Sequence, residues 1–339
     1  MSRKHLFRWM AVFVVAAAVP VATQSRVNIK LGSLVPENSP WANALKGMGA
    51  AWSKTTGNRV RIQPYFNVFP SESAIIGRMA LNNLQMATLQ AGGLAEIDEA
   101  FNVFGIPFFF QSDEELAAVQ QALTPIIERR LAVKKFRLVH WGNAGWVQVF
   151  SKEAIRNLDD LKHAKLYTGD GTPKMVQWYT SNGFHVVPLP AAEIPKQLKL
   201  PTGAIDAAPS PPVLALTLQF FRDAPYMLDV RVAPLTGATI VTEAAWNKIS
   251  PADRTAMLDT AKQVEAQIQK DAPGLDAKAV TEMKGAGLQV IALDEGVLAE
   301  FRRVAESLLS SQRGNMVPAD VFDAAVNARD VYRAAHGGR

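Results

Sequence analysis

Residues 27–63 read VNIKLGSLVPENSPWANALKGMGAAWSKTTGNRVRIQ, and this stretch decides the fold class. It opens with an apolar run of strand length that ends at Leu34. Ser39 and Pro40 then match the cap and first residue of a helix, and large apolar residues follow at helical spacing from Trp41. After Gly57, apolar and polar residues alternate as in a half-buried strand. A strand, a helix and a second strand in this order predict a parallel βαβ unit.

The same alternation continues outward along the chain. Ser112 to Glu115 resembles a capping box that opens another helix. Further helices are predicted over 71–83, 172–182 and 193–200, and strands over 84–89, 136–141, 146–150, 165–168, 185–188, 204–208 and 238–242. This order predicts an α/β protein with parallel βαβ sheets.

The last third is mostly helical. Residues 251–284 follow a helical pattern that we expect to be interrupted at Pro273-Gly274, and 285–339 hold a strand followed by two helices. No repeat and no change of composition marks a linker, so we expect lobes joined by strands that cross between them more than once.

The N-terminus has the pattern of an export signal. Arg3, Lys4 and Arg8 precede an almost wholly apolar run from Trp9 to Ala22. That run is shorter than the roughly 20 residues that span a bilayer, so we interpret residues 1–25 as a cleavable signal peptide. The alternative is an uncleaved N-terminal anchor. No later stretch is apolar enough to cross a membrane, so we expect an exported, soluble protein.

Composition excludes several function classes. The net charge is +5, and the signal peptide carries three of the positive charges without any acid, so the remainder is nearly neutral and has no electrostatic footprint for nucleic acid. The chain has no cysteine, which excludes disulfides, thiol catalysis and thiolate metal sites. About 315 residues beyond the signal exceed one ordinary core, which predicts two lobes.

Motifs for catalysis are missing. His140, His163 and His185 are scattered and form no metal-ligand pair, and Asp159-Asp160 matches a solvated helix start. No nucleophile elbow and no glycine-rich phosphate loop is present. We therefore expect no enzyme activity, no cofactor and no metal, although a scattered Ser-His-acid triad is not excluded by sequence.

Loops rich in Gly, Pro and aromatic residues follow the predicted strands, where ligands bind in open α/β folds. We expect these loops to meet around a small molecule, with aromatic side chains for surface, polar groups for hydrogen bonds and glycines for backbone approach. The candidate ligand-binding residues are Ser39, Trp41, Gly92, Gly93, Trp141, Asn143, Trp146, Tyr167, Asp170 and Ser210. The alternative for each aromatic is an ordinary place in a core.

At these loops the chain resembles the periplasmic solute-binding proteins of TRAP transporters, the DctP type. The resemblance covers about 27–332 and is carried by several motifs in order. These are GSLVPENSPW (32–41), NLQMA (83–87) with GGLA (92–95), IPFFF (106–110) with SDEE (112–115), LDDLKHAK (158–165) and TGAID (202–206).

The resemblance implies a two-lobed binding protein that closes on its ligand by hinge motion and delivers it to an ion-driven permease of two membrane subunits. It implies lobe I over 26–147 and about 233–250, and lobe II over 148–232 with C-terminal segments. A long helix over about 251–284 would span both lobes.

One position departs from the family pattern. Members that bind organic acids carry an Arg two residues after the lysine that corresponds to Lys165, and that Arg pairs with the ligand carboxylate. Here Tyr167 stands at this position. The chain therefore resembles a divergent branch, associated with tetratricopeptide-repeat partner proteins, and we expect an amphipathic or weakly charged ligand.

Three alternatives remain open. An organic-acid receptor would use Lys174, Lys165 or Arg78 in place of the missing Arg. An exported hydrolase or isomerase on the same fold would show turnover. A ligand sensor that signals to a partner would bind without any permease.

Overall fold

In the computed structural model, which describes residues 26–169 and 173–337, two long strands run the length of one mixed sheet. The predicted signal peptide and Asp170 lie outside the described residues. The strands are β1 (Val27–Ser33), β2 (Val60–Phe66), β3 (Met86–Gln90), β4 (Phe136–Ser151), β5 (Leu166–Gly169), β6 (Val186–Leu189), β7 (Ala207–Ser210), β8 (Tyr226–Thr242) and β9 (Gln289–Ile291). No helix among the described residues is long and apolar enough to cross a membrane.

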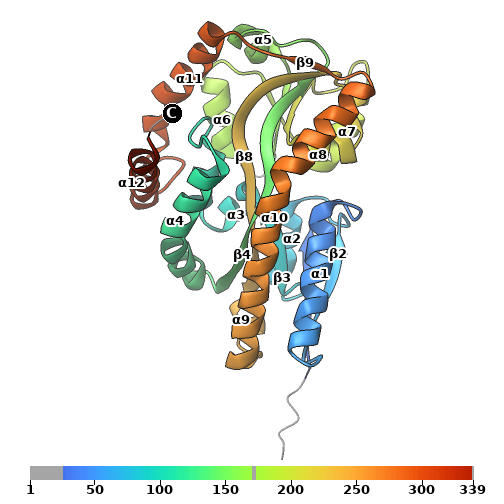
Figure 1. Cartoon of the computed structure of the whole chain (residues 1–339), viewed down its shortest axis with the longest axis vertical. Coiled ribbons are helices and arrows are strands. Elements are labelled where there is room, and N and C mark those ends of the chain that lie inside the picture. The colour runs from blue at the N-terminus through green and yellow to red at the C-terminus, as the bar shows by residue number, and fades with distance from the viewer. Residues whose placement is uncertain (1–25, 170–172, 338–339) are drawn as a thin grey trace, which may run out of the picture.

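Helices cover both faces of the sheet (Figure 1). The α-helices are α1 (Pro40–Thr55), α2 (Glu72–Ala80), α3 (Ala91–Ile97), α4 (Asp113–Val133), α5 (Leu158–His163), α6 (Pro173–Ser181), α7 (Ile194–Lys199), α8 (Pro212–Thr217), α9 (Glu243–Trp246), α10 (Pro251–Gly285), α11 (Glu295–Leu309) and α12 (Ala319–His336). Short 3₁₀ turns are η1 (Glu99–Gly105), η2 (Ala191–Glu193), η3 (Phe220–Arg222) and η4 (Ser310–Gln312).

The sheet divides into two lobes that share β4 and β8. Its order is β2-β1-β3-β8-β4-β7-β5-β6, with β9 beside β8. Lobe I holds β1, β2 and β3, and lobe II holds β5, β6, β7 and β9. The predicted α/β class and two-lobed architecture are confirmed.

The strand directions correct part of the prediction. Pairs β1–β2, β1–β3, β5–β6 and β5–β7 are parallel as expected. The pairs β3–β8, β4–β8 and β4–β7 are antiparallel, so the expectation of parallel sheets was wrong in the middle of the molecule. Two strands that each cross from one lobe to the other, in opposite directions, must pair antiparallel.

The crossing strands are longer than predicted. The segments 136–141 and 146–150 form one strand, β4, and the segment 238–242 is only the end of β8. The ladder between β4 and β8 shifts register between Leu138 and His140, and again after Asn143 and Val147. These irregularities interrupt the side-chain alternation, which hides the continuity of the strand from a period-two pattern.

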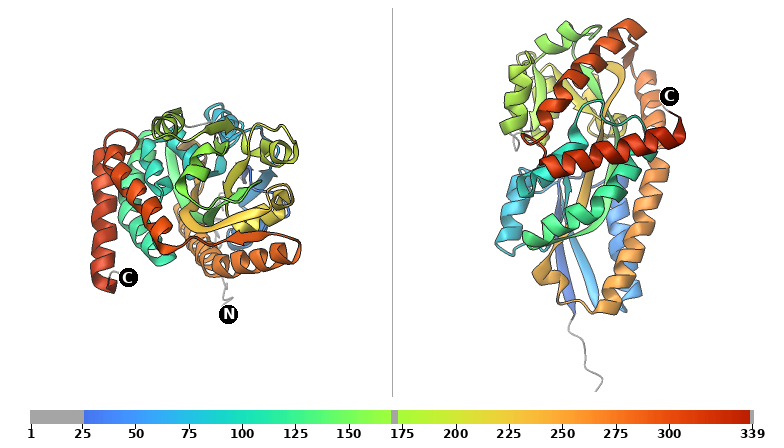
Figure 2. Two further views of the ribbon diagram at one scale, coloured as in Figure 1. Left: turned by 90° about the horizontal axis from the view of Figure 1, so that it is seen from above. Right: turned by 90° about the vertical axis from the view of Figure 1, so that its left-hand side faces the viewer.

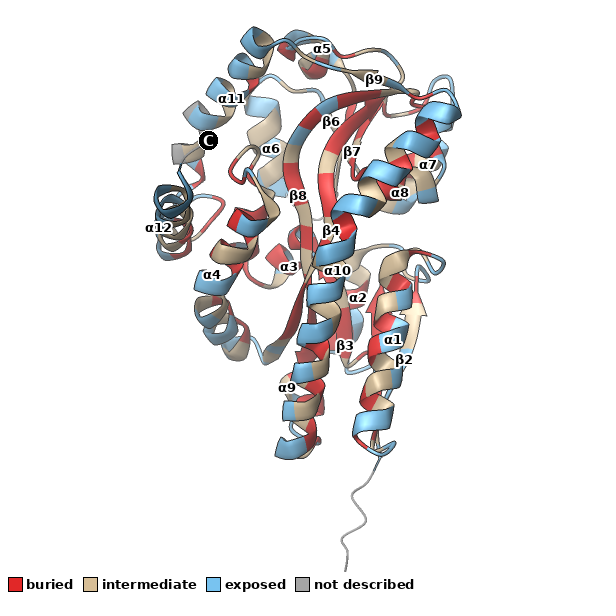
Figure 3. Ribbon diagram, in the orientation of Figure 1, coloured by how far each residue is buried: buried red, intermediate tan, exposed pale blue. Residues whose placement is uncertain are grey.

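Helix α10 is one continuous helix that contributes to the cores of both lobes (Figures 1 and 3). Met257 packs with α1 in lobe I, and Met283 packs with η3 and β8 in lobe II. The predicted interruption at Pro273-Gly274 was wrong. Both residues are exposed, and the turn that contains them buries Ala272. Packing along the rest of the helix outweighs the loss of one backbone hydrogen bond at proline.

The C-terminal segments are divided between the lobes. Strand β9 and helix α11 pack with lobe II, through Val290 and Phe301. Helix α12 lies against α4 and η1 of lobe I, where Val321 and Phe322 are buried (Figure 2). Arg333 of α12 also pairs with the buried Glu115 of α4 at 2.8 Å.

Candidate ligand-binding site

A cavity of about 220 Å³ lies between the lobes, over the middle of the sheet. Lobe I lines it from β1, the β1–α1 loop, α1 and β3, and lobe II lines it from η2, α7 and α8. Strands β4 and β8 contribute the residues where they pass between the lobes, among them Asn143 and Thr236. We call this the cleft cavity.

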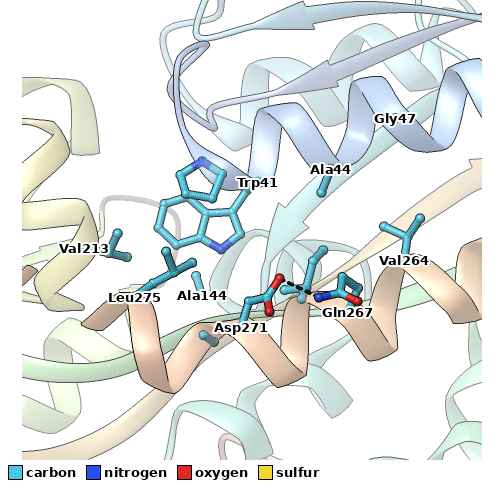
Figure 4. A pocket seen from close by; sticks show the side chains of 12 residues that line it. Trp41, Ala44, Gly47, Ala144, Val213, Val264, Gln267, Asp271 and Leu275 are labelled. Atoms are coloured by element: carbon cyan, nitrogen blue, oxygen red, sulfur yellow. Dashed lines mark hydrogen bonds between the residues drawn. The ribbon is translucent and has the colours of Figure 1, made fainter. Parts of the chain in front are cut away.

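Trp41 extends the cleft cavity toward α10. It lines the cleft cavity and a neighbouring hollow of about 240 Å³, and Ala144 and Ile268 also line both. In this hollow the Trp41 side chain points from the start of α1 toward α10, near Leu275 and Val213 (Figure 4). Trp41 also packs against the core of lobe II, so it touches both lobes at the site.

A third cavity of about 260 Å³ lies next to the cleft cavity and shares Gln90, Leu235 and Thr236 with it. Its wall includes a cluster of aromatic side chains from lobe II, Trp178, Tyr179 and Phe184. Burial raises the pKa of the Tyr179 phenol to about 12. This wall is uncharged, because no acidic or basic side chain lines it among the described residues.

Most polar groups of the cleft cavity are already hydrogen-bonded within the protein. Ser33 Oγ donates to the Thr88 carbonyl at 3.0 Å, and Thr236 Oγ1 donates to the Gly142 carbonyl at 2.8 Å. Asn143 donates to Asp113 at 3.1 Å and accepts from Gly145 N at 3.0 Å. These bonds hold the cavity floor in one arrangement before any ligand enters.

Among the described residues, Glu72 supplies the one carboxyl that lines the cleft cavity. Glu72 accepts from the backbone N–H of Gln90 at 2.8 Å and from that of Gly93. Burial is the largest influence on this group and raises its pKa to about 8. Any side chain at Gly93 would collide with the Glu72 carboxyl, so this glycine makes room for a residue of the protein.

Three of the predicted site residues line the three cavities above. Trp41 and Asn143 line the cleft cavity, and Gly92 lines the third cavity, where it has open space in front of its Cα. The predicted loop around Gly92-Gly93 is in fact the first turn of α3.

Two predicted tryptophans lie in the core of lobe I. Trp141 is buried against Phe101 and Phe104 and donates to Thr124 Oγ1 at 3.0 Å. Trp146 is buried and donates to Asp113 at 3.2 Å. The indole N–H of each is therefore satisfied inside the protein, and neither lines the cleft cavity as described here.

Ser39, Tyr167 and Ser210, which were also predicted to bind ligand, contact other parts of the protein instead of lining the cleft cavity. Ser39 is buried and caps α1, where it accepts from Ala42 N at 3.2 Å and donates to the Pro36 carbonyl at 2.6 Å. Tyr167 packs against the core of lobe II. Ser210 is buried and donates to the Pro211 carbonyl at 3.1 Å.

The candidate substitute cations have other partners. Lys165 pairs with Asp206 at 3.4 Å, Lys174 pairs with Glu99, and the Arg78 guanidinium lies 5.6 Å from the Phe69 ring centre. Among the described residues, no lysine or arginine lines any of the three cavities above. Nor do the described residues contain a cluster of acids and histidines suited to a metal ion.

Sequence reasoning missed His140 and Glu72 of the cleft cavity. His140 begins the strand-end loop that supplied the candidates Trp141, Asn143 and Trp146, but it was not predicted as a binding residue. Glu72 resembles an ordinary acid in the first turn of a helix, and only the approach of α3 places it in the cleft.

Residues 31–314 match the family model of bacterial extracellular solute-binding proteins, family 7, known as DctP. The chain belongs to this family. The predicted family and the predicted function, that of a solute receptor, are therefore both confirmed.

Relatives of this solute-binding protein are distant in sequence and close in fold. It is 25% identical to a solute-binding protein of Roseobacter denitrificans, over 88% of this chain and 95% of the relative, and 23% identical to one of Verminephrobacter eiseniae, over 81% of each chain. A TRAP periplasmic solute-binding protein of Desulfovibrio salexigens with bound orotic acid superposes with a TM-score of 0.83 at 14% identity, covering 91% of this chain and 99% of that one. The galactonate complex of the sugar-acid-binding protein of Advenella mimigardefordensis gives the same TM-score at 16% identity, with the same coverage.

Proposed function

We propose that this solute-binding protein is exported to the periplasm, binds an amphipathic or weakly charged small molecule between its lobes, and passes it to a TRAP-type permease. The signal-like N-terminus and the family membership support export and delivery. The ligand leaves unchanged, because the protein acts as a receptor and not as an enzyme. A tetratricopeptide-repeat protein is the further partner that the divergent loop pattern favours.

The observation that carries the ligand class is the lining of the cavities. Trp41, Leu214, Leu218 and Ile268 surround the cleft cavity, and no lysine or arginine lines it among the described residues. A carboxylate moved from water into such a place loses its hydration without gaining an ion pair, which is costly. An apolar or amphipathic molecule instead gains free energy from the surface it buries.

The organic-acid alternative has support from relatives. Solved structures of similar fold are described with orotic acid, galactonate and succinate, and a relative from Escherichia coli is named a 2,3-diketo-L-gulonate-binding protein. In this chain Tyr167 replaces the carboxylate-pairing Arg, and the three substitute cations contact other groups. We therefore favour the weakly charged ligand.

Calorimetric titration of the purified protein with matched probes tests this choice. Cinnamyl alcohol, cinnamyl methyl ether and cinnamate share a shape and differ in charge, and succinate and galactonate represent small acids. We expect the two uncharged cinnamyl compounds to bind more tightly than cinnamate. Binding of the acids alone would contradict the proposal, and mass spectrometry showing a converted probe would contradict the receptor role.

A further inference from the structure

His140 lies on strand β4 in the wall of the cleft cavity. The ladder shifts register beside it, so that it stands opposite Thr239 of β8. Its side chain belongs to the buried polar groups, with 4% of the residue exposed. A bound molecule in the cleft cavity would therefore meet this imidazole with little water between them.

The hydrogen bond of one ring nitrogen decides the tautomer. His140 Nδ1 lies 2.8 Å from the backbone carbonyl oxygen of Trp141. A carbonyl oxygen only accepts, so Nδ1 must carry the proton. Burial lowers the pKa of the ring, which keeps it neutral at physiological pH. A neutral ring with a protonated Nδ1 has an unprotonated Nε2, which acts only as an acceptor.

Nε2 has no partner among the described residues, although it is buried. His140 differs in this from its polar neighbours in the cavity, because Ser33, Asn143 and Thr236 all have hydrogen bonds within the protein. An unmet buried acceptor costs about 1–3 kcal/mol, so native proteins pair nearly all such groups. The donor that pairs with Nε2 therefore comes from outside the described residues, from water or from a bound molecule.

We propose that His140 Nε2 accepts a hydrogen bond from a hydroxyl or N–H group of the ligand and makes that donor a requirement for tight binding. The inference deepens the proposed function and rests on it, since it names the polar end of the weakly charged ligand. A carboxylate has no proton to donate, so His140 favours a hydroxyl or N–H over a carboxylate at this place in the cleft cavity. Sites built around such a group discriminate strongly against analogues that lack the matching atom.

Two variants separate the hydrogen bond from the support of the strand. In His140→Asn the side-chain amide keeps a donor near the Trp141 carbonyl and loses the acceptor at the position of Nε2. In His140→Gln the longer amide restores a polar group there. The matched control is His163→Asn, because His163 makes the same kind of bond, to the Asp159 carbonyl at 2.7 Å. His163 is exposed and lines none of the three cavities.

The test compares cinnamyl alcohol, which donates, with cinnamyl methyl ether, which does not. In the wild-type protein we expect the alcohol to bind about tenfold more tightly than the ether, the factor that one hydrogen bond of ordinary strength supplies. We expect His140→Asn to reduce this ratio to about one and His140→Gln to restore part of it. His163→Asn should leave the ratio unchanged.

Different results would contradict the role of His140 and the proposal of a weakly charged ligand. Equal affinities for alcohol and ether in the wild type, or an unchanged ratio in His140→Asn, would overturn the role of His140 and leave the weakly charged ligand standing. Tight binding of cinnamate alone would overturn both. Nitrogen-15 NMR gives a readout without any ligand, because a proton on Nε2 in the free protein would also exclude the proposed acceptor.

Discussion

Trp41 is the residue that connects the lobes at the cleft. It stands at the start of α1 in lobe I, lines the cleft cavity, and packs against the core of lobe II. Its position follows from local chemistry, because the Ser39 cap and Pro40 fix the first turn of α1 and so direct the next side chain.

We expect Trp41→Ala to weaken binding of cinnamyl alcohol about thirtyfold, the usual cost of removing a central aromatic anchor. The loss of stability should be small, since Trp41 is only half-buried. Trp246→Phe is the matched control, because Trp246 is buried in lobe I and lines none of the cavities described here. Calorimetric titration measures the affinity of each variant, and thermal unfolding measures its stability. Equal affinities of wild type and Trp41→Ala would refute the prediction.

Asp253 makes stability depend on pH. Its buried carboxylate receives two hydrogen bonds from Arg59, at 2.6 and 2.9 Å, and this pairing lowers its pKa from the ordinary value of 3.8. A depressed pKa contributes stability above the ordinary value, and this contribution is lost as the pH falls through the lowered value.

Asp253→Asn should therefore lower the melting temperature at pH 7. The difference in melting temperature between the variant and the wild type should become smaller as the pH falls below about 4. Thermal unfolding between pH 7 and pH 2 checks this. Asp323→Asn is a control, since Asp323 pairs with Arg313 at an exposed place and exposed pairs contribute little. A difference in melting temperature that stays constant with pH would show that the ion pair does not cause the difference.

At the scale of elements, α10 joins the lobes. Trp52 of α1 donates to the Met257 carbonyl at 3.0 Å, and Glu265 accepts from Trp141 N at 3.1 Å. Farther along, Asp276 accepts from Val213 N at 3.2 Å and from Trp146 N at 3.4 Å. These bonds hold the helix on both sides of Pro273, and Asp276 alone receives bonds from residues of both lobes, which explains why the helix continues through Pro273.

Pro273→Ala should raise the free energy of unfolding by about 1–3 kcal/mol, because a proline inside a helix removes one hydrogen bond and strains the preceding turn. The gain is reduced by the greater freedom of the unfolded alanine chain. Urea unfolding checks the change, with Pro251→Ala as the control, since Pro251 occupies the first turn of α10 where proline is tolerated. A less stable Pro273→Ala protein would mean that α10 needs the proline for its shape.

At the scale of the whole molecule, ligand binding should draw the lobes together about β4 and β8. The absence of native cysteines allows two dyes to be attached at chosen sites. Val68→Cys in lobe I and Leu200→Cys in lobe II place the dyes on exposed positions of different lobes.

We expect energy transfer between these dyes to rise on addition of cinnamyl alcohol, as the lobes close on the cleft cavity. The control pair, Val68→Cys and Val133→Cys, has both exposed positions in lobe I and should not respond. Transfer that stays constant in the first pair while calorimetry shows binding would mean that the lobes bind ligand without closing.

How much of the site was predictable differs from residue to residue. Trp41 and Asn143 were predicted from loops at strand ends, and both line the cleft cavity. Trp141 and Trp146 share the same loop character and lie in the core of lobe I instead. The difference depends on which face of β4 each side chain occupies, and the register shifts along that strand hide this from the sequence.

The sequence by itself determined the α/β class, the two-lobed family, the capped helices and the absence of disulfides, because these depend on local spacing and composition. Only the tertiary structure decided that two predicted strands form one β4, that α10 continues through Pro273, and that His140 and Glu72 line the cleft cavity. Burial and hydrogen-bond partners arise between segments far apart in the chain. A sequence pattern therefore predicts the helices and strands but not the contacts between them.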